Sequence, residues 1–423
     1  MKIAFITAFP PSHHALNEYG FHVADQLRRE PTVDLTVLGD HLDAPAPELP
    51  GFNVVRCWGF GKWDSSLSLL RALRRIQPDV AWFNLGFASF GDRPLPAILG
   101  LITPAAARLC GISSHVTLHQ LFETVDLNDA AVSSRRLYRA GGWLATHLLL
   151  SASSLSVLLP PYRRILNEKY RRGRVSARRH GVFAGKPEPP DFTLRGNPVH
   201  RILAFGKWGT YKRVDLLIDA FNRLAKLHDV RLVVGGGDHP KTPGYIESMA
   251  RKHASDRISF LGYVPEELIA RLFLEASFVV MPYTSSAGSS GVAHLAAQYG
   301  VPIIASDIQD FRELAEHEGM AIRFFKPGDV SSLFEQMLLA LSSPEQLKEM
   351  ASQNHAAAVA MSMPHVVRDY IQAFRQRERV ATLQMAAQLR RNDRFHQNEK
   401  LALAVGDRLH RWQEEDAAPN SAL

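Results

Sequence analysis

The chain has 423 residues, 46% of them hydrophobic and 22% charged, with a formal net charge of +7. These proportions are typical of globular proteins, and the length exceeds that of one ordinary domain, so we expect two domains and a further segment. No apolar run approaches the roughly 20 residues that a membrane-spanning helix needs, so the composition argues against an integral membrane protein.

Signals for export are weak. The N-terminal apolar run is short and lacks a small-residue cleavage site, so we interpret it as a first strand and not as a signal peptide. The cysteines are Cys57 and Cys110, and two thiols so far apart in sequence do not build a disulfide framework. We therefore expect a cytoplasmic protein, either free or peripheral on the cytoplasmic face of the membrane.

The first half of the sequence alternates short apolar runs with amphipathic stretches. Strands are predicted at residues 2–7, 33–38, 53–57, 80–84, 115–118 and 154–158. Helices are predicted at residues 18–29, 67–76, 95–109 and 133–150. Such alternation indicates a parallel, doubly wound sheet.

A stretch rich in glycine and proline, residues 181–197, predicts the linker to a second alternating series. The strands of that series are predicted at residues 201–205, 230–234, 258–260, 278–281 and 301–305. Its helices are predicted at residues 214–227, 244–253, 265–275 and 330–341. The fold class is therefore α/β, with two Rossmann-like domains that face a cleft at the carboxyl ends of both sheets.

The expected domain bounds are 1–185, 186–363 and 364–423. The last segment is charged and has apolar residues at helical spacing, so we expect C-terminal helices that return in part to the first domain. A docking or self-associating helix and a partly disordered tail are both compatible with this pattern. The final residues, 416–423, have the composition of a disordered end.

The stretch 278–307 predicts a strand, a Gly/Ser loop, a short helix and a second strand. The first N–H groups of a helix have no intrahelical partner and favour an anion, and glycine lets the backbone approach it closely. The predicted diphosphate-binding residues of this loop are Gly288, Ser289, Ser290, Gly291 and Val292.

Two lysines flank the turn between a predicted strand and an amphipathic helix of the second domain. Lys207 and Lys212 both belong at the carboxyl edge of the sheet, where cations would stabilise a departing diphosphate. The alternative is that Lys212 is an ordinary solvated residue of the first helical turn, although a cation there is disfavoured by about 0.3–1 kcal/mol.

Other candidates are weaker. His119 ends a predicted strand and either hydrogen-bonds a sugar hydroxyl, takes part in proton movement, or is structural; for His180 we favour a structural role. The turn Gly235, Gly236, Gly237 and Asp238 either leaves room for a nucleotide base or only reverses the chain. No Asp-x-Asp and no Cys/His cluster with metal spacing occurs, so we expect no metal site.

A basic segment, residues 163–179, has eight basic residues and one acid, which accounts for the net charge of the chain. The candidate acceptor or lipid patch within it consists of Arg163, Arg164, Arg171 and Arg172. The alternatives are a solvated basic face and an anionic lipid surface or phosphorylated glycolipid. No motif for reading bases accompanies the charges, so we expect no nucleic-acid partner.

Several of these motifs resemble those of the GT-B retaining glycosyltransferases of family 4, over about residues 1–375. The matching features are the Gly-Lys-x-x-x-x-Lys turn 206–212, the Gly-Gly-Gly-Asp turn, Pro282–Tyr283, the run 299–307, the strand end 117–119 and His180–Gly181. The resemblance implies a nucleotide-diphospho-sugar donor, retention at the anomeric carbon, and no metal or other cofactor. It implies that Lys207 and Lys212 hold the diphosphate and that His119 lies near the transferred sugar.

The sequence departs from the family pattern at three places. Ala287 and Leu295 stand where the family carries two glutamates, and Lys207 stands where arginine is common. The Gly-rich turn after the first strand is replaced by residues 13–15, His-His-Ala. These departures leave the sugar, the base and the acceptor undetermined.

The resemblance implies a metal-independent retaining hexosyltransferase that acts on a glycan, a lipid-linked or a small-molecule acceptor. The alternatives are a GT-B scaffold or binding protein without activity, motivated by Ala287 and Leu295, and a GT-B nucleotide-sugar epimerase. The expected partners are the nucleotide sugar, the acceptor, an anionic membrane surface at residues 163–179, and a second copy through the C-terminal helix.

Overall fold

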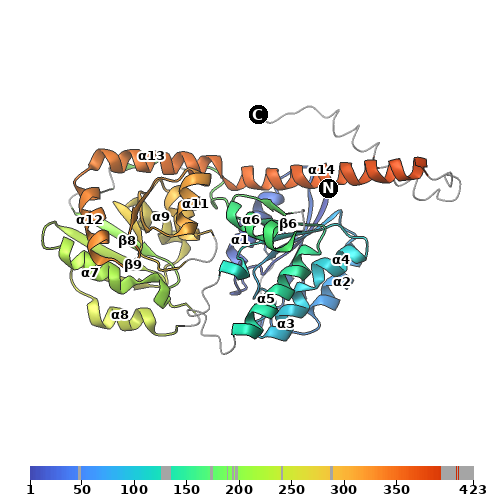
Figure 1. Ribbon diagram of the computed structural model, residues 1–423, viewed down its shortest axis with the longest axis horizontal. Coiled ribbons are helices and arrows are strands. Elements are labelled where there is room, and N and C mark those ends of the chain that lie inside the picture. The colour runs from blue at the N-terminus through green and yellow to red at the C-terminus, as the bar shows by residue number, and fades with distance from the viewer. Residues whose placement is uncertain are drawn as a thin grey trace. The chain divides into compact units, whose positions relative to one another are not determined.

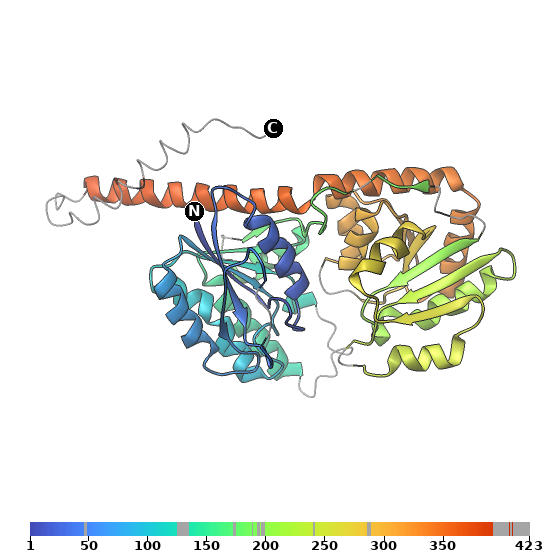
Figure 2. The same ribbon diagram turned by 180° about the vertical axis from the view of Figure 1, so that it is seen from behind.

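The computed structural model describes residues 1–45, 49–124, 135–171, 175–187, 189–192, 195, 199–239, 242–285, 289–391, 406 and 408. It contains two parallel sheets, each flanked by helices (Figures 1 and 2). Gly288 and Arg172, two of the predicted site residues, lie outside the described residues, as does Ala287.

The first sheet has seven strands in the order β3-β2-β1-β4-β5-β6-β7. Its strands are β1 (Lys2–Ile6), β2 (Asp34–Asp40), β3 (Val54–Trp58), β4 (Val80–Leu85), β5 (Ser114–Leu118), β6 (Ser154–Val157) and β7 (Val175–Ala177). Its helices are α1 (Asn17–Leu27), α2 (Ser65–Ile76), α3 (Pro94–Leu101), α4 (Thr103–Leu109), α5 (Arg135–Leu150) and α6 (Pro160–Tyr170). All of the pairings are parallel, and continuous apolar runs such as that of β4 are buried on both faces.

The second sheet has six strands in the order β10-β9-β8-β11-β12-β13. Its strands are β8 (His200–Phe205), β9 (Val230–Gly235), β10 (Ile258–Gly262), β11 (Phe278–Met281), β12 (Ile303–Ser306) and β13 (Ile322–Phe325). The helices that follow in sequence are α7 (Val214–Leu224), α8 (Tyr245–His253), α9 (Glu266–Leu274), α10 (Gly291–Gln298), α11 (Gln309–Glu318), α12 (Val330–Leu341), α13 (Pro344–Ala360) and α14 (Met363–Arg391).

The predicted α/β fold with two doubly wound sheets is confirmed. One predicted helix, residues 95–109, is instead two helices, α3 and α4, and Pro104 near the start of α4 explains the break because it has no N–H to continue the earlier helix. Five of the described helices and strands were not predicted: β7, β13, α6, α11 and α13.

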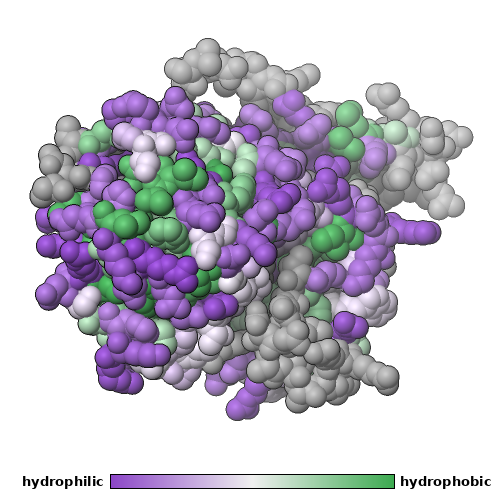
Figure 3. All heavy atoms as spheres, turned by 60° about the vertical axis from the view of Figure 1, so that its left-hand side comes forward, coloured by the Kyte–Doolittle hydropathy of each residue, from purple (hydrophilic) through white to green (hydrophobic). Residues whose placement is uncertain are grey.

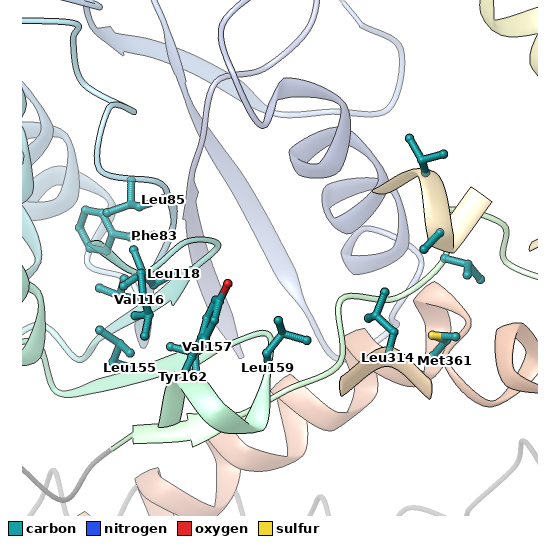
Figure 4. Close-up of a cluster of buried hydrophobic side chains, with 14 of the residues drawn as sticks. Phe83, Leu85, Val116, Leu118, Leu155, Val157, Leu159, Tyr162, Leu314 and Met361 are labelled. Atoms are coloured by element: carbon teal, nitrogen blue, oxygen red, sulfur yellow. The ribbon is translucent and has the colours of Figure 1, made fainter. Parts of the chain in front are cut away.

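The core is apolar and continuous along the sheet faces. Figure 4 shows Phe83, Val116 and Leu155, from β4, β5 and β6, side by side, with Leu159 and Tyr162 at the start of α6. Each of these five side chains is at most 1% exposed. Burial of apolar surface stabilises the folded state by about 25 cal/mol per Å². The buried core therefore holds in place the strand ends from which the polar residues project.

The chain divides into two compact units, residues 1–366 and 367–423. Within the first unit, residues 361–362 return to the crossing segment: the N–H of Val182 donates to the carbonyl of Met361 at 3.0 Å. The predicted bounds of the three domains stay predictions.

The surface has apolar patches among hydrophilic residues, and Figure 3 shows one on the face turned forward. Among the described residues, no helix is both long and apolar enough to cross a membrane. Both cysteines are free thiols, as the sequence predicted, and burial raises the pKa of Cys57 to about 12.

Candidate functional site

Lys212 ends a short 3-10 turn, Thr210–Lys212, that follows β8. Its side chain is 8% exposed, and its Nζ lies 4.9 Å from the ring centroid of Tyr283 and 5.9 Å from that of Trp208. Within the described part of the chain, nothing forms a hydrogen bond or an ion pair with this ammonium. Burial, and then the charge of Lys207, lowers its pKa from 10.5 to about 8. An unpaired buried cation is costly, which indicates that it is kept for a ligand.

The ammonium faces the start of α10 across Gly206. A Cβ added at Gly206 would lie 2.7 Å from the Nζ of Lys212 and 3.3 Å from the Cγ2 of Val292. The N–H of Thr284 donates to the carbonyl of Tyr211 at 2.8 Å, which joins the loop after β11 to the turn that carries Lys212. The glycine therefore leaves a space between a cation and a helix N-terminus, where an anion is favoured.

Two neutral polar groups at this end of α10 are also unsatisfied. The hydroxyl oxygens of Tyr283 and Ser289 are buried and have no hydrogen-bond partner among the described residues. Ser290 caps α10 by accepting a hydrogen bond from the N–H of Ala293 at 3.4 Å, and Gly291 is exposed at the first helical position. Buried polar groups in folded proteins are rarely left without a partner, so several such groups together indicate a ligand site.

Lys207 is exposed and lies on the side of this site that faces α1. Burial raises the pKa of Glu18, in the first turn of α1, and the carboxylate of Glu266 raises it further, while the charge of Lys207 lowers it. The structure therefore brings an acidic group of the first sheet's helices close to the lysine. Glu18 had no sequence signal, because a glutamate at a helix start is common.

His119 is buried at the end of β5, as the sequence predicted for its position in the chain. Its Nε2 lies 2.6 Å from the Oδ1 of Asn84, whose amide in turn donates to the hydroxyl of Thr7 at 3.1 Å. Because that oxygen is an acceptor, Nε2 carries the proton and Nδ1 of the neutral ring is left with a lone pair. Burial lowers the pKa of His119 to about 3, so the ring is neutral near pH 7.

A row of histidines connects His119 to α10. The ring centroid of His180 lies 6.0 Å from that of His119 and 4.5 Å from that of His294 on α10. The Nε2 of His294 is 2.9 Å from Oε2 of Glu318, close enough for an ion pair but not aligned as a hydrogen bond. Burial opposes protonation of His294, but the Glu318 carboxylate outweighs it and raises the pKa. Sequence reasoning missed this pair, because its two members lie on different helices.

The turn 235–238 is bonded to its neighbours. The carbonyl of Gly235 accepts from the N–H of Gly206 at 3.1 Å, and that of Gly237 accepts from Trp208 at 2.8 Å. Gly236 has φ 103°, and a Cβ there would lie 1.9 Å from the carbonyl oxygen of Gly206. Asp238 accepts from two backbone N–H groups at the start of α8, both at 2.7 Å. These contacts explain the residue types of the turn, and its role toward a nucleotide base stays a prediction.

Helix α6 contains Arg163 and Arg164 and lines a cavity of about 530 Å³. The opposite wall is formed by Thr284 and Ser285, which precede the α10 loop, and by the start of α11. The lining combines apolar side chains with polar ones, and the hydroxyl of Tyr162 donates to Asp310 at 3.2 Å. Such a cavity has the size and the hydrogen-bonding groups of a small-ligand site.

Some basic side chains of the segment 163–179 form ion pairs or hydrogen bonds with other residues of the chain. Arg164 lies 3.5 Å from Glu313, Lys169 lies 3.0 Å from Glu123, and Arg179 donates to the carbonyl of Ala360 at 3.0 Å. Arg163 and Arg171 are exposed. The assignment of this segment to a lipid or acceptor stays a prediction.

Glu313, Glu316 and His317 form the metal-like group found among the described residues. Two of its members already pair, since His317 lies 2.9 Å from Glu313, and Arg164 neutralises the same carboxylate. An acidic group on one helix with internal ion pairs does not indicate a metal site.

The departures from the family pattern have structural correlates. Leu295 is half-buried and packs against the apolar core. In the turn after β1, the Nδ1 of His14 lies 2.7 Å from buried Asp40, and Leu16 adopts φ 69° at the start of α1. A left-handed leucine is unusual, and glycine would adopt this conformation more easily.

A comparison with protein families finds one match in the second half of the chain. Residues 199–343 match the family model of the glycosyl transferases group 1. This stretch is therefore similar to the group 1 glycosyl transferase domain. It contains Lys207, Lys212 and α10, and the resemblance expected from the sequence is confirmed.

Several solved structures have a fold similar to that of this chain. Sucrose-phosphate synthase from Thermosynechococcus elongatus is 16% identical, with a TM-score of 0.70 over 90% of this chain and 100% of that chain. HepE from Anabaena in complex with UDP-glucose is 14% identical, with a TM-score of 0.67 over 89% and 100%. WaaG, a glycosyltransferase involved in lipopolysaccharide biosynthesis, is 14% identical, with a TM-score of 0.59 over 88% and 99%. Among curated proteins, no sequence matches the chain.

Proposed function

We propose that the chain is a retaining glycosyltransferase that moves a hexosyl unit from a nucleotide-diphospho-sugar to an acceptor hydroxyl, without a metal ion. The observation that carries the proposal is the buried, unpaired ammonium of Lys212 beside the N-terminus of α10. The group 1 domain and the fold shared with HepE, whose structure contains UDP-glucose, support the same donor class.

The leaving diphosphate would lie between Lys212 and the first N–H groups of α10, with Lys207 at the open side. Negative charge develops on its oxygens as the bond to the sugar breaks, and each preorganised cation or N–H donor can contribute about 3 kcal/mol in the transition state. The hydroxyls of Tyr283 and Ser289 would complete the cradle, since both are buried and free to donate. Ser290 is already committed to capping the helix.

His119 would act as a neutral hydrogen-bonding group toward the sugar. Its Nδ1 lone pair can accept a hydrogen bond from a sugar hydroxyl, while Asn84 holds the other nitrogen. A pKa lowered to about 3 argues against a role as a general acid near pH 7. The sequence motifs point to no nucleophile, so we infer a front-face displacement in which a departing phosphate oxygen accepts the acceptor's proton.

The cavity of about 530 Å³ between α6 and α11 is our candidate for the acceptor. Its hydroxyl, amide and carboxylate groups suit a polyol, and Arg164 at its rim suits an acceptor with a phosphate or carboxylate. Of the acceptor classes, a glycan or a lipid-linked sugar fits these groups better than an apolar small molecule does.

The test of the proposal is turnover and donor binding. A thermal-shift screen of UDP-, GDP- and ADP-sugars identifies the donor, since a ligand that binds only the folded state raises the unfolding temperature. With that donor, Lys212→Ala should lower turnover by at least about a hundredfold. Undiminished turnover in this variant would remove the proposed role of Lys212.

A second function, a binding protein without transferase activity, is favoured by one observation. Leu295 packs into the core at the position where the family has a glutamate, so one sugar contact is missing. Calorimetry with nucleoside diphosphates and nucleotide sugars, followed by product analysis, distinguishes the candidates. Donor binding without product, with any acceptor, would support the binding protein, and a converted donor without acceptor would support an epimerase.

A further inference from the structure

The exposed side of α2 has an unusual composition. Leu67, Arg71, Arg74 and Arg75 occur at helical spacing, and all four are exposed. Trp63, one turn before Leu67 in sequence, is 74% exposed, and Leu67 is 50% exposed. A large aromatic and a leucine in water, in line with three arginines, are not accounted for by the proposed active site.

Neighbouring helices extend this surface. Helices α2, α3, α4 and α5 contact one another in turn along one side of the first sheet (Figure 1). The hydroxyl of Thr103 in α4 donates to that of Ser66 in α2 at 2.9 Å. Leu95 in α3 is 65% exposed, and Trp143 in α5 is 52% exposed. We call the exposed residues of these four helices, together with Trp63, the α2–α5 face.

The charge of these helices has one sign. Their sequences contain seven arginines, three in α2, one in α4 and three in α5, and no aspartate or glutamate. Exposed Asp64 and Asp92 lie just before α2 and α3, but the exposed arginines Arg71, Arg74, Arg75, Arg108 and Arg139 outnumber them. By comparison, the exposed leucines near α9, Leu261 and Leu268, lie in a groove with Arg271 and Glu275 and follow Glu267. The α2–α5 face therefore has an excess of positive charge, which complements a negatively charged partner, and the groove near α9 does not.

We propose that the α2–α5 face binds the surface of an anionic lipid bilayer. Tryptophan is favoured at the boundary between headgroups and acyl chains, where its ring is half in water and half in an apolar medium. Arginine can place its stem along the apolar layer and its guanidinium among phosphates. A helix with leucine and arginines on the same exposed side suits this boundary, because both groups find partners at one depth.

This assignment differs from the basic segment 163–179 as the lipid contact. In that segment, Arg164 and Lys169 are paired with carboxylates, whereas no ion pair is found for Arg71, Arg74 or Arg75 in the described part of the chain. The α2–α5 face also has exposed large apolar side chains beside its charges, which α6 lacks. The inference does not depend on the proposed reaction.

The experiment is co-sedimentation of the full chain with vesicles of phosphatidylcholine, with and without phosphatidylglycerol. We expect binding only to the vesicles with phosphatidylglycerol, and weaker binding as salt is added. The triple variant Arg71→Gln, Arg74→Gln and Arg75→Gln should lower the partition coefficient by about a hundredfold. The double variant Trp63→Ser and Leu67→Ser should lower it by at least about tenfold.

Matched controls make the result specific. Arg163→Gln with Arg171→Gln removes two exposed charges of the basic segment, and Leu261→Ser with Leu268→Ser removes two exposed leucines near α9. Both controls should bind as the wild type does. Equal binding by the α2 variants and the wild type, or loss of binding in either control alone, would overturn the proposal. Unfolding temperatures equal to that of the wild type show that each variant is folded, and no nucleotide is needed, so this test stands apart from that of the reaction.

Discussion

Replacing Lys212 by methionine should make the protein more stable and weaken diphosphate binding at the same time. Methionine fills nearly the same volume and has no charge to desolvate. A pKa lowered from 10.5 to about 8 corresponds to roughly 3 kcal/mol, at about 1.4 kcal/mol for each tenfold change in the protonation equilibrium. We therefore expect Lys212→Met to raise the free energy of unfolding by about 1–3 kcal/mol, since part of the penalty is relieved by local relaxation.

The pH dependence of this difference has a definite sign. The pKa of Lys212 in the folded state, about 8, is below the unfolded value of 10.5, so the folded protein carries the full penalty at and below pH 8. As the pH rises from 8 toward 10.5, the folded protein releases the proton first and the wild type gains stability. The advantage of Lys212→Met should therefore be largest below pH 8 and decrease above it, when unfolding by urea is measured for both proteins.

Binding should change in the opposite direction. A charge-assisted hydrogen bond to a phosphate contributes about 1.5–3 kcal/mol, so calorimetry should show nucleoside diphosphates bound at least about tenfold more weakly by Lys212→Met. Lys207→Met is the matched control: that lysine is exposed, so only its repulsion of Lys212 is relieved, and both the gain in stability and the loss of binding should be smaller than for Lys212→Met. The reasoning would be refuted if Lys212→Met were less stable than the wild type and bound the diphosphate equally well.

Gly236→Ala should destabilise the protein by about 3 kcal/mol or more in urea unfolding, because its Cβ would lie 1.9 Å from the carbonyl oxygen of Gly206; an unchanged midpoint would contradict this. Tyr283→Phe removes a buried hydroxyl without a partner, so stability should stay within about 1 kcal/mol while calorimetry shows roughly tenfold weaker diphosphate binding. His294→Gln should cost about 3 kcal/mol near pH 6 by leaving Glu318 unpaired, and adding Glu318→Gln should recover most of it. The pKa of His294 is raised in the folded protein, so the destabilisation by His294→Gln should be complete below pH 6.5 and should decrease as the pH rises through that folded-state pKa. A destabilisation that does not depend on pH would count against the ion pair.

The fold could be predicted because its strands are short apolar runs between amphipathic helices. The elements that were missed have weak patterns. Strand β13 is only four residues long and includes Arg323, and α13 is rich in alanine, so neither has a clear apolar face in the sequence. Such elements are stabilised by their neighbours: β13, at the edge of the second sheet, pairs with β12.

The position of Lys212 at the sheet edge could be predicted from the sequence, but the burial of its ammonium could not. The Gly-Lys turn places the lysine at the sheet edge, but its burial depends on Trp208, Tyr283 and the loop after β11 closing around it. The same holds for His294 and Glu318, which meet only because α10 and α11 pack together. Contacts between two elements cannot be predicted from the local sequence pattern of either element.

The buried lysine also bears on the choice between a transferase and a protein that has lost its ligand. A protein without a donor would gain roughly 3 kcal/mol if Lys212 were replaced by an apolar residue, and Leu295, where the family resemblance leads us to expect a glutamate, is apolar. Under the proposed function, the ammonium that would bind the diphosphate is present although its burial is costly, while Leu295 offers no carboxylate to the sugar. This combination is expected if the diphosphate still binds and the sugar is held by other groups, among which His119 is the best placed. A protein that binds no diphosphate has no physical reason to keep Lys212 buried and unpaired.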